Sequence, residues 1–135
     1  MKNFENLNGA LVLVRPDLQD PAMQQGKIGI VTYARESDEI YVGLLNGAES
    51  KYDGNDLMLL KEKGEILEEL RSNGSAMELN DFKSLYKIML LQERGTSTAL
   101  VNALEIAAQK PGVWDKALNK VGNEQALEIS KTYSR

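Results

Sequence analysis

The sequence predicts an α+β protein in which a strand-rich first half precedes a helix-rich second half. Two observations support this prediction. Apolar residues alternate with a period of two over residues 1–61, and from residue 62 they recur at the three- and four-residue spacing of helices. Strands followed by a run of helices favour an α+β fold over a doubly wound parallel sheet, so no nucleotide site at a switch point is expected. We therefore expect a strand domain over 1–61 and a helical bundle over 62–135.

Five short strands are expected in the first half, over residues 10–15, 27–33, 39–45, 49–52 and 57–60. The turns support this assignment. Asn46-Gly47 predicts a two-residue hairpin between the third and fourth strands, because both positions tolerate positive φ. The segment 53–56, with the sequence Asp-Gly-Asn-Asp, suits a single helical turn before the last strand.

The second half predicts four to five short helices separated by glycines. The first covers 65–72, and residues 75–78 match a capping box for a second that ends near Arg94, with Gly95 at its C′ position. Thr96 is expected to cap a third helix, which ends before Pro111. A short fourth and a last fifth helix follow, with the apolar residues Val113, Trp114, Ala117, Leu118, Val121, Ala126, Leu127, Ile129 and Tyr133.

The order of strands and turns over 1–61 resembles the SH3-like small barrels, the architecture shared by SH3, Tudor and KOW modules. The features that carry the resemblance are the long first connection over 16–26, the Asn-Gly hairpin and the helical turn before the final strand. The resemblance implies a five-stranded barrel. It does not imply one function, because these barrels bind peptides, methylated side chains and RNA alike.

Composition excludes several kinds of chemistry. The 135 residues include no cysteine and no histidine, which excludes Ser-His and Cys-His nucleophile pairs and His/Cys zinc or haem sites. We expect no catalytic residues, no metal site and no cofactor. The chain has no apolar run long enough for a membrane helix and no signal-like amino terminus, which predicts a cytoplasmic protein without membrane contact.

Charge disfavours nucleic acid as the main partner. Sixteen Lys and Arg residues oppose twenty Asp and Glu residues, a net charge of −4, and no basic cluster interrupts either half. A protein partner or self-association as a homodimer is the favoured expectation.

Alternation along the second and third strands predicts which side chains face outward. The aliphatic set comprises Ile28, Ile30 and Thr32 on the second strand and Ile40, Val42 and Leu44 on the third. If this set lines the barrel, the outer face carries Val31, Tyr33, Tyr41 and Leu45. Such an apolar face is usually covered by the chain's own helices, by a second copy or by a ligand. Trp114 is a further candidate, because it either packs its helix onto the bundle or anchors an interface.

Two other features have a functional and a structural interpretation. Tyr33, Tyr41 and Tyr52 could contribute to an aromatic cage for a methylated side chain, although packing and cross-strand pairing are favoured. Asp17 and Asp20 occupy the place of the acidic RT loop of SH3 domains, although a solvated loop is the favoured interpretation.

The sequence thus favours a non-enzymatic protein-interaction or adaptor protein. The alternative is an RNA- or DNA-binding small barrel, and an enzyme that uses carboxylates alone is the weakest hypothesis.

Overall fold

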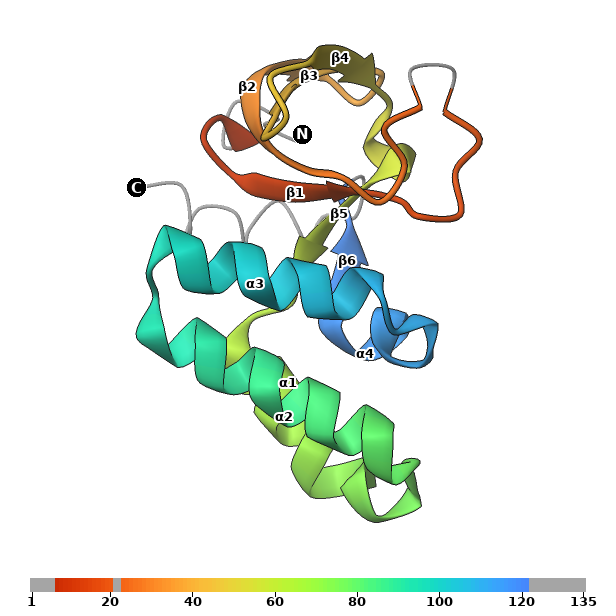
Figure 1. Cartoon of the computed structure of the whole chain (residues 1–135), viewed down its shortest axis with the longest axis vertical. Coiled ribbons are helices and arrows are strands. Elements are labelled where there is room, and N and C mark those ends of the chain that lie inside the picture. The colour runs from red at the N-terminus through yellow and green to blue at the C-terminus, as the bar shows by residue number, and fades with distance from the viewer. Residues whose placement is uncertain (1–6, 21–22, 122–135) are drawn as a thin grey trace. The chain divides into compact units, whose positions relative to one another are not determined.

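The computed structural model describes residues 7–20 and 23–121 and confirms an α+β fold. The chain divides into two compact units (Figure 1). The strand unit takes the described residues up to Leu59 and those from Asn119 onward, and the helical unit is Leu60–Leu118. The predicted last helix, with Ala126, Leu127, Ile129 and Tyr133, lies outside the described residues.

The strands form one sheet with the order β4-β3-β2-β1-β5-β6. Their bounds are β1 Leu11–Val14, β2 Ile28–Glu36, β3 Glu39–Leu44, β4 Glu49–Tyr52, β5 Leu57–Leu60 and β6 Leu118–Lys120. The pairings of β1 with β2 and β5, and of β3 with β2 and β4, are antiparallel. Both predicted turns lie where expected. The 3-10 turn η2, Gly54–Asp56, is confirmed and is capped by the Asp53 side chain. The β3–β4 connection covers residues 45–48 and, of Asn46 and Gly47, only Gly47 has a positive φ, of 94°, so it is not the predicted two-residue hairpin.

The sheet has six strands and two edges, which corrects the predicted closed barrel of five strands. The sixth strand, β6, lies in a segment that was predicted to belong to the fourth helix. The short helix α4, Trp114–Ala117, ends because Leu118 adopts an extended backbone. The Val121 amide then donates to the Leu57 carbonyl at 3.0 Å, so hydrogen bonding along β5 overrides the helical pattern of the sequence.

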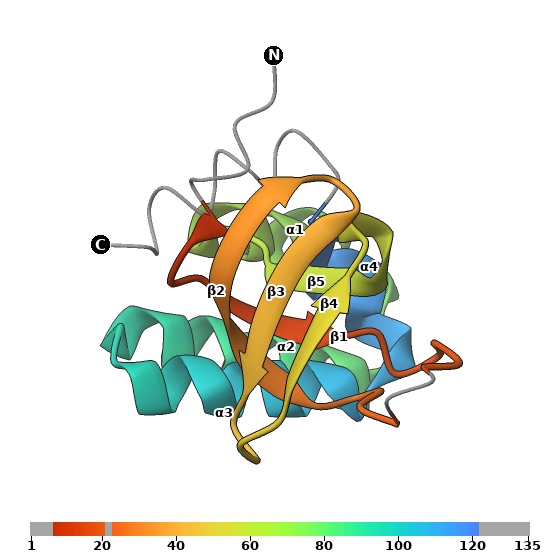
Figure 2. The ribbon, with the colours of Figure 1, turned by 90° about the horizontal axis from the view of Figure 1, so that it is seen from above.

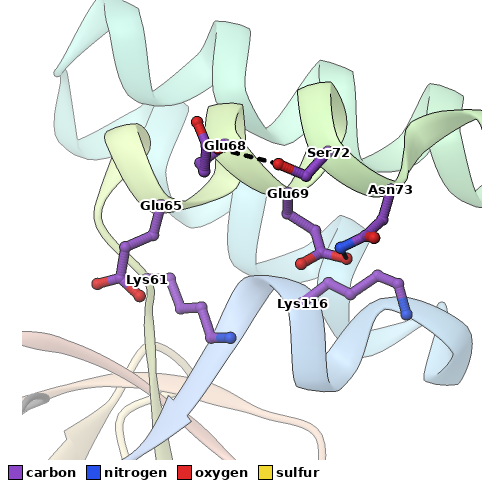
Figure 3. Close-up of a pocket in the computed structure, with 7 residues that line it drawn as sticks. All are labelled: Lys61, Glu65, Glu68, Glu69, Ser72, Asn73 and Lys116. Atoms are coloured by element: carbon purple, nitrogen blue, oxygen red, sulfur yellow. Dashed lines mark hydrogen bonds between the residues drawn. The ribbon is translucent and has the colours of Figure 1, made fainter.

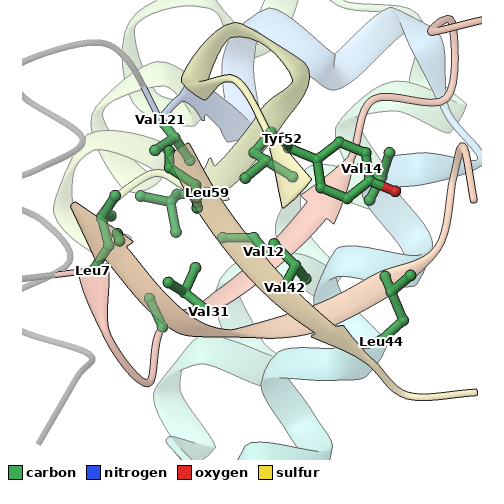
Figure 4. Close-up of a cluster of buried hydrophobic side chains, with 13 residues drawn as sticks. Leu7, Val12, Val14, Val31, Val42, Leu44, Tyr52, Leu59 and Val121 are labelled. Carbon is green, nitrogen blue, oxygen red and sulfur yellow. The ribbon is translucent and has the colours of Figure 1, made fainter. Parts of the chain in front are cut away.

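The sheet curls around its own hydrophobic core (Figures 2 and 4). The core cluster comprises Leu7, Ala10, Val12, Val14, Val31, Ala34, Ile40, Val42, Leu44, Tyr52, Leu57, Leu59 and Val121. Every predicted strand of the first half contributes to it. The inward phase predicted for β3 is confirmed, because Ile40, Val42 and Leu44 are all buried.

The structure reverses the phase predicted for β2. Val31 is 1% exposed in the core, whereas Ile30 is 41% exposed on the opposite face. The inward side of β2 begins with Gly29, whose Cβ, if present, would lie 2.6 Å from Val42 Cγ1. A side chain does not fit at this position, so Gly29 and Val31 take the inner face. Ile28, Ile30 and Thr32 lie outside the core cluster, although Ile28 is only 7% exposed.

The helical unit contains the helices α1 Lys63–Asn73, α2 Leu79–Arg94, α3 Ser97–Ala108 and α4, with the 3-10 turns η3 Gly74–Ala76 and η4 Pro111–Val113. α2 packs against both α1 and α3. Two predicted helix ends are confirmed: Gly95 follows α2 with a φ of 71°, and the Thr96 hydroxyl accepts from the Ala99 amide at 3.1 Å. The predicted capping box is wrong, because η3 takes up Ser75 and the N-cap of α2 is Glu78, without a side-chain bond.

No helix in the described part of the chain is long and apolar enough to cross a membrane.

Because Val31 and not Ile30 faces the core, truncating Val31 should destabilise the fold more than truncating Ile30. Val31→Ala should lower the free energy of unfolding by about 1–3 kcal/mol, because it leaves a cavity in the core. Ile30→Ala removes more atoms but should cost about 1 kcal/mol or less, because that side chain is partly solvated. Urea titration of both variants followed by circular dichroism tests this, and an Ile30→Ala cost above that of Val31→Ala would contradict the assignment.

Candidate interaction surface

Two tyrosines form an exposed pair on the outer face of β2 and β3. Tyr33 and Tyr41 are register partners across these antiparallel strands, and their ring centroids lie 6.2 Å apart with an interplanar angle of 33°. Tyr33 is 46% exposed, and Tyr41 is half-buried. The register shifts between Val31 and Tyr33, and this irregularity lets Val31 face the core while Tyr33 faces outward.

The pair continues into a mixed polar face across β3 and β4. Tyr41 is the register partner of Lys51, and Gly43 lies between Ile30 and Glu49. The Thr32 hydroxyl lies 3.2 Å from the Tyr41 carbonyl oxygen and 3.1 Å from Glu49 Oε2, so it can donate to either. We call this set, Ile30, Thr32, Tyr33, Tyr41, Glu49 and Lys51, the tyrosine face.

The predicted surface residues fall in different places. The structure brings Tyr33 and Tyr41 together, as predicted, and leaves Leu45 exposed next to the Asn46-Gly47 turn. Val31 lies in the core instead. Trp114 belongs to the helical unit, where it is half-buried and its indole N–H donates to the Ala107 carbonyl of α3 at 2.7 Å. The indole N–H is therefore already hydrogen-bonded inside the helical unit.

Tyr52 cannot complete an aromatic cage with the other two rings. Its ring is buried in the core, on the inner side of β4, whereas Tyr33 and Tyr41 lie on the outer face. The favoured interpretation, a cross-strand pair, therefore agrees with the geometry of Tyr33 and Tyr41.

A buried carboxylate anchors the long β1–β2 connection. Asp20 is almost fully buried. Its carboxylate accepts a hydrogen bond from the Tyr52 hydroxyl at 2.6 Å and one from the backbone N–H of Gln24 at 3.2 Å. Burial, and then the adjacent Asp20 carboxylate, raises the pKa of Tyr52 above its ordinary value. Sequence pattern gave no sign of this contact, because an aspartate in a polar loop is ordinarily solvated.

Asp17 in the same connection forms an ion pair with Arg15. Its carboxylate accepts from Arg15 Nε at 3.0 Å and from Arg15 Nη2 at 2.8 Å. These hydrogen bonds lower the pKa of Asp17 and raise the pKa of Arg15. Arg15 also donates to the Asn55 carbonyl, which fastens the start of the connection to η2. The two acidic residues therefore hold the connection in place.

The helical unit carries a pocket of about 300 Å³ (Figure 3). It is lined by Lys61, Glu65, Glu68, Glu69, Ser72, Asn73 and Lys116. The Glu68 carboxylate accepts from Ser72 at 2.9 Å, the Glu69 carboxylate from Asn73 at 3.1 Å, and Lys61 Nζ donates to the Asp115 carbonyl at 2.6 Å. These bonds are typical of a hydrated helix surface. Among residues 7–20 and 23–121, no group of three or more acidic side chains is arranged to hold a metal ion.

Comparisons with known proteins give no assignment. No family model matches the chain, and no curated protein or solved structure is significantly similar to it. The functional argument therefore depends on the geometry of the chain itself.

The Asp20–Tyr52 contact predicts a defined response to pH. Because folding raises the pKa of Tyr52, the folded state keeps its proton at pH values where the unfolded tyrosine has lost it. The contribution is complete below the ordinary tyrosine pKa of about 10, and stability falls as pH rises above it, by at most about 1.4 kcal/mol per pH unit. Tyr52→Phe should remove this part of the slope, and should cost about 1–2 kcal/mol at pH 7 because the buried Asp20 carboxylate loses one of its hydrogen-bond donors.

The measurement is the free energy of unfolding of wild type and Tyr52→Phe between pH 7 and about pH 11. Tyr33→Phe is the matched control, because it removes the hydroxyl of a tyrosine outside the Asp20 contact and should leave the free energy of unfolding at pH 7 unchanged. Equal slopes in wild type and Tyr52→Phe would contradict the assigned contact.

Proposed function

We propose that this chain is a non-enzymatic protein-interaction protein whose strand unit binds a protein partner through the tyrosine face. The observation that carries the proposal is the Tyr33–Tyr41 ring pair on the outer face of the sheet, with Tyr33 exposed and Tyr41 half-buried. Tyrosine is enriched in protein interfaces, since its ring supplies apolar contact area while its hydroxyl remains available for a hydrogen bond.

The local structure supports this use of the pair. Tyr33 and Tyr41 extend from paired strands, so their backbones are held in register before any partner binds. A tyrosine has few side-chain torsions to immobilise, which keeps the entropic cost of binding low. The surrounding Thr32, Glu49 and Lys51 supply the polar rim that transient interfaces use.

The proposal includes a relationship of the strand unit to the SH3-like small barrels. Its supports are the order of β1 to β5, the long β1–β2 connection, the hairpin at Gly47 and η2 before β5. In this proposal β6 is an addition to the five-stranded arrangement.

An RNA- or DNA-binding role is the alternative, because exposed aromatic rings can stack on bases. Its support is the Tyr33–Tyr41 pair beside Lys51. Charge weakens it. Glu49 lies on the same face, Glu36 and Glu39 are register partners at the end of β2 and β3, and the chain has a net charge of −4. These carboxylates repel phosphate groups, so a protein is the better partner.

The test compares stoichiometric partners of wild type and a Tyr33→Ala/Tyr41→Ala variant, recovered by affinity purification with quantitative mass spectrometry and then reconstituted from purified proteins. The affinity of the reconstituted complex should fall about tenfold or more in the variant, since interface tyrosines are frequent hot spots. Leu45→Ala, an exposed residue outside the pair, is the matched control. A monomeric chain with no stoichiometric partner, or a partner bound equally by the double variant, would contradict the proposal.

The nucleic-acid alternative has its own measurement, which is fluorescence anisotropy with a labelled single-stranded RNA and DNA at low salt. We expect no binding. Binding that weakens steeply with salt and is lost in Tyr33→Ala/Tyr41→Ala would instead favour the alternative.

A further inference from the structure

The helical unit exposes four large apolar side chains on α1 and α2. Leu67, Leu79, Tyr86 and Leu90 are between 41% and 64% exposed. Along α2 the last three lie seven and four residues apart, which places them on one side of the helix. Leu85 and Ile88 form the buried side of the same helix. α2 therefore has an apolar stripe in addition to the one that packs within its unit.

Leu67 of α1 lies beside this stripe. α1 and α2 run antiparallel: Lys63 at the start of α1 pairs with Glu93 near the end of α2 at 3.5 Å, and Gly74, just after α1, packs on the Phe82 ring. Leu67 follows Lys63 by four residues, and Tyr86 follows Phe82 by four, so both lie on the side of the helix pair where these contacts occur. We call Leu67, Leu79, Tyr86 and Leu90 the α1–α2 face.

The rim of the α1–α2 face is mainly cationic. Lys83 lies between Leu79 and Tyr86 along the stripe, Lys87 follows Tyr86, and Arg94 lies one turn beyond Leu90; all three are exposed. None of the three forms an ion pair with a described residue. Arg71 of α1 is a further exposed cation one turn after Leu67, but it is paired with Glu68 at 3.8 Å. The acidic Glu93 is already paired with Lys63.

We propose that the α1–α2 face binds an amphipathic helix of a partner protein, with leucine-type anchors on one side and acidic residues at its margins. An apolar surface formed by two helices can take such a helix through anchors at i, i+3 or i+4, and i+7. Acidic margins on the partner would match Lys83, Lys87 and Arg94, whose charges are unused within the described residues.

The same charges disfavour a second copy of this chain as the occupant. A second copy related by a two-fold axis would bring cationic rims together, and this like-charge contact is costly. An anionic lipid surface could also attract these cations, and the vesicle measurement below distinguishes it from a partner helix.

This inference deepens the proposed protein-binding function by adding a second surface with a defined partner chemistry. It does not depend on the tyrosine face, and its test uses different residues.

The probe is a fluorescein-labelled synthetic helix of about 18 residues with leucines at helical spacing and glutamates at the margins. The control peptide has lysine in place of each glutamate. In anisotropy titrations with the full chain, the acidic peptide should bind about tenfold more tightly than the control. Leu90→Gln should weaken its binding about fivefold or more, and Lys83→Glu/Lys87→Glu by at least as much. Because all these side chains are exposed, the variants should keep the wild-type circular dichroism and melting temperature.

The matched controls are Leu45→Gln, another exposed leucine, and Lys110→Glu, an exposed lysine beyond the end of α3; both should leave peptide affinity unchanged. Equal affinity for the two peptides, or an unchanged affinity in Leu90→Gln, would overturn the inference. So would a dimeric mass, or binding to phosphatidylcholine/phosphatidylserine vesicles, that Leu90→Gln abolishes. Tyr33→Ala/Tyr41→Ala should bind the acidic peptide normally, so failure here leaves the tyrosine-face proposal standing.

Discussion

The close approach of β2 to β3 at Gly29 is the constraint on which the strand unit depends. A Cβ atom at this position would lie 2.8 Å from the Gly43 carbonyl oxygen and 3.1 Å from Leu44 Cα, as well as close to Val42. Backbone atoms cannot move away as a flexible side chain can, so only glycine fits here. With Gly29 facing inward, Val31 faces the core and the following irregularity turns Tyr33 outward. The phase of β2, and with it the tyrosine face, follows from this contact.

The long β1–β2 connection is held by polar contacts where the apolar core does not reach. Burying the Asp20 carboxylate carries a desolvation cost, which its hydrogen bonds from Tyr52 and the Gln24 amide offset. Asn46 at the hairpin also donates to the Gln24 side chain at 2.8 Å. These bonds link the connection to β4 and to the β3–β4 turn. A polar loop of this length consequently has a defined position beside the core.

The two proposed binding surfaces differ in their chemistry. The tyrosine face combines aromatic rings with charges of both signs, and it lies on the paired strands β2 and β3. The α1–α2 face combines leucines with a cationic rim, and it lies on helices. Surfaces of such different composition suit different partners, which is the property an adaptor requires.

Local sequence signals determined the parts of this fold in which a residue acts on its immediate neighbours. The Asn46-Gly47 turn, the Thr96 cap, the Gly95 helix end and the bounds of β4 and β5 follow from backbone preferences and short-range hydrogen bonds. Tertiary structure alone decided the inward face of β2, the strand β6 in place of a longer helix, the burial of Asp20, and the placing of Leu67 on the same side of the α1–α2 pair as Tyr86. Each of these depends on a partner distant in the chain: Val42 for Gly29, Leu57 for Val121, Tyr52 for Asp20, and α2 for α1. A periodic pattern shows that a face is apolar, but which face turns inward is set by the space that the distant partner leaves.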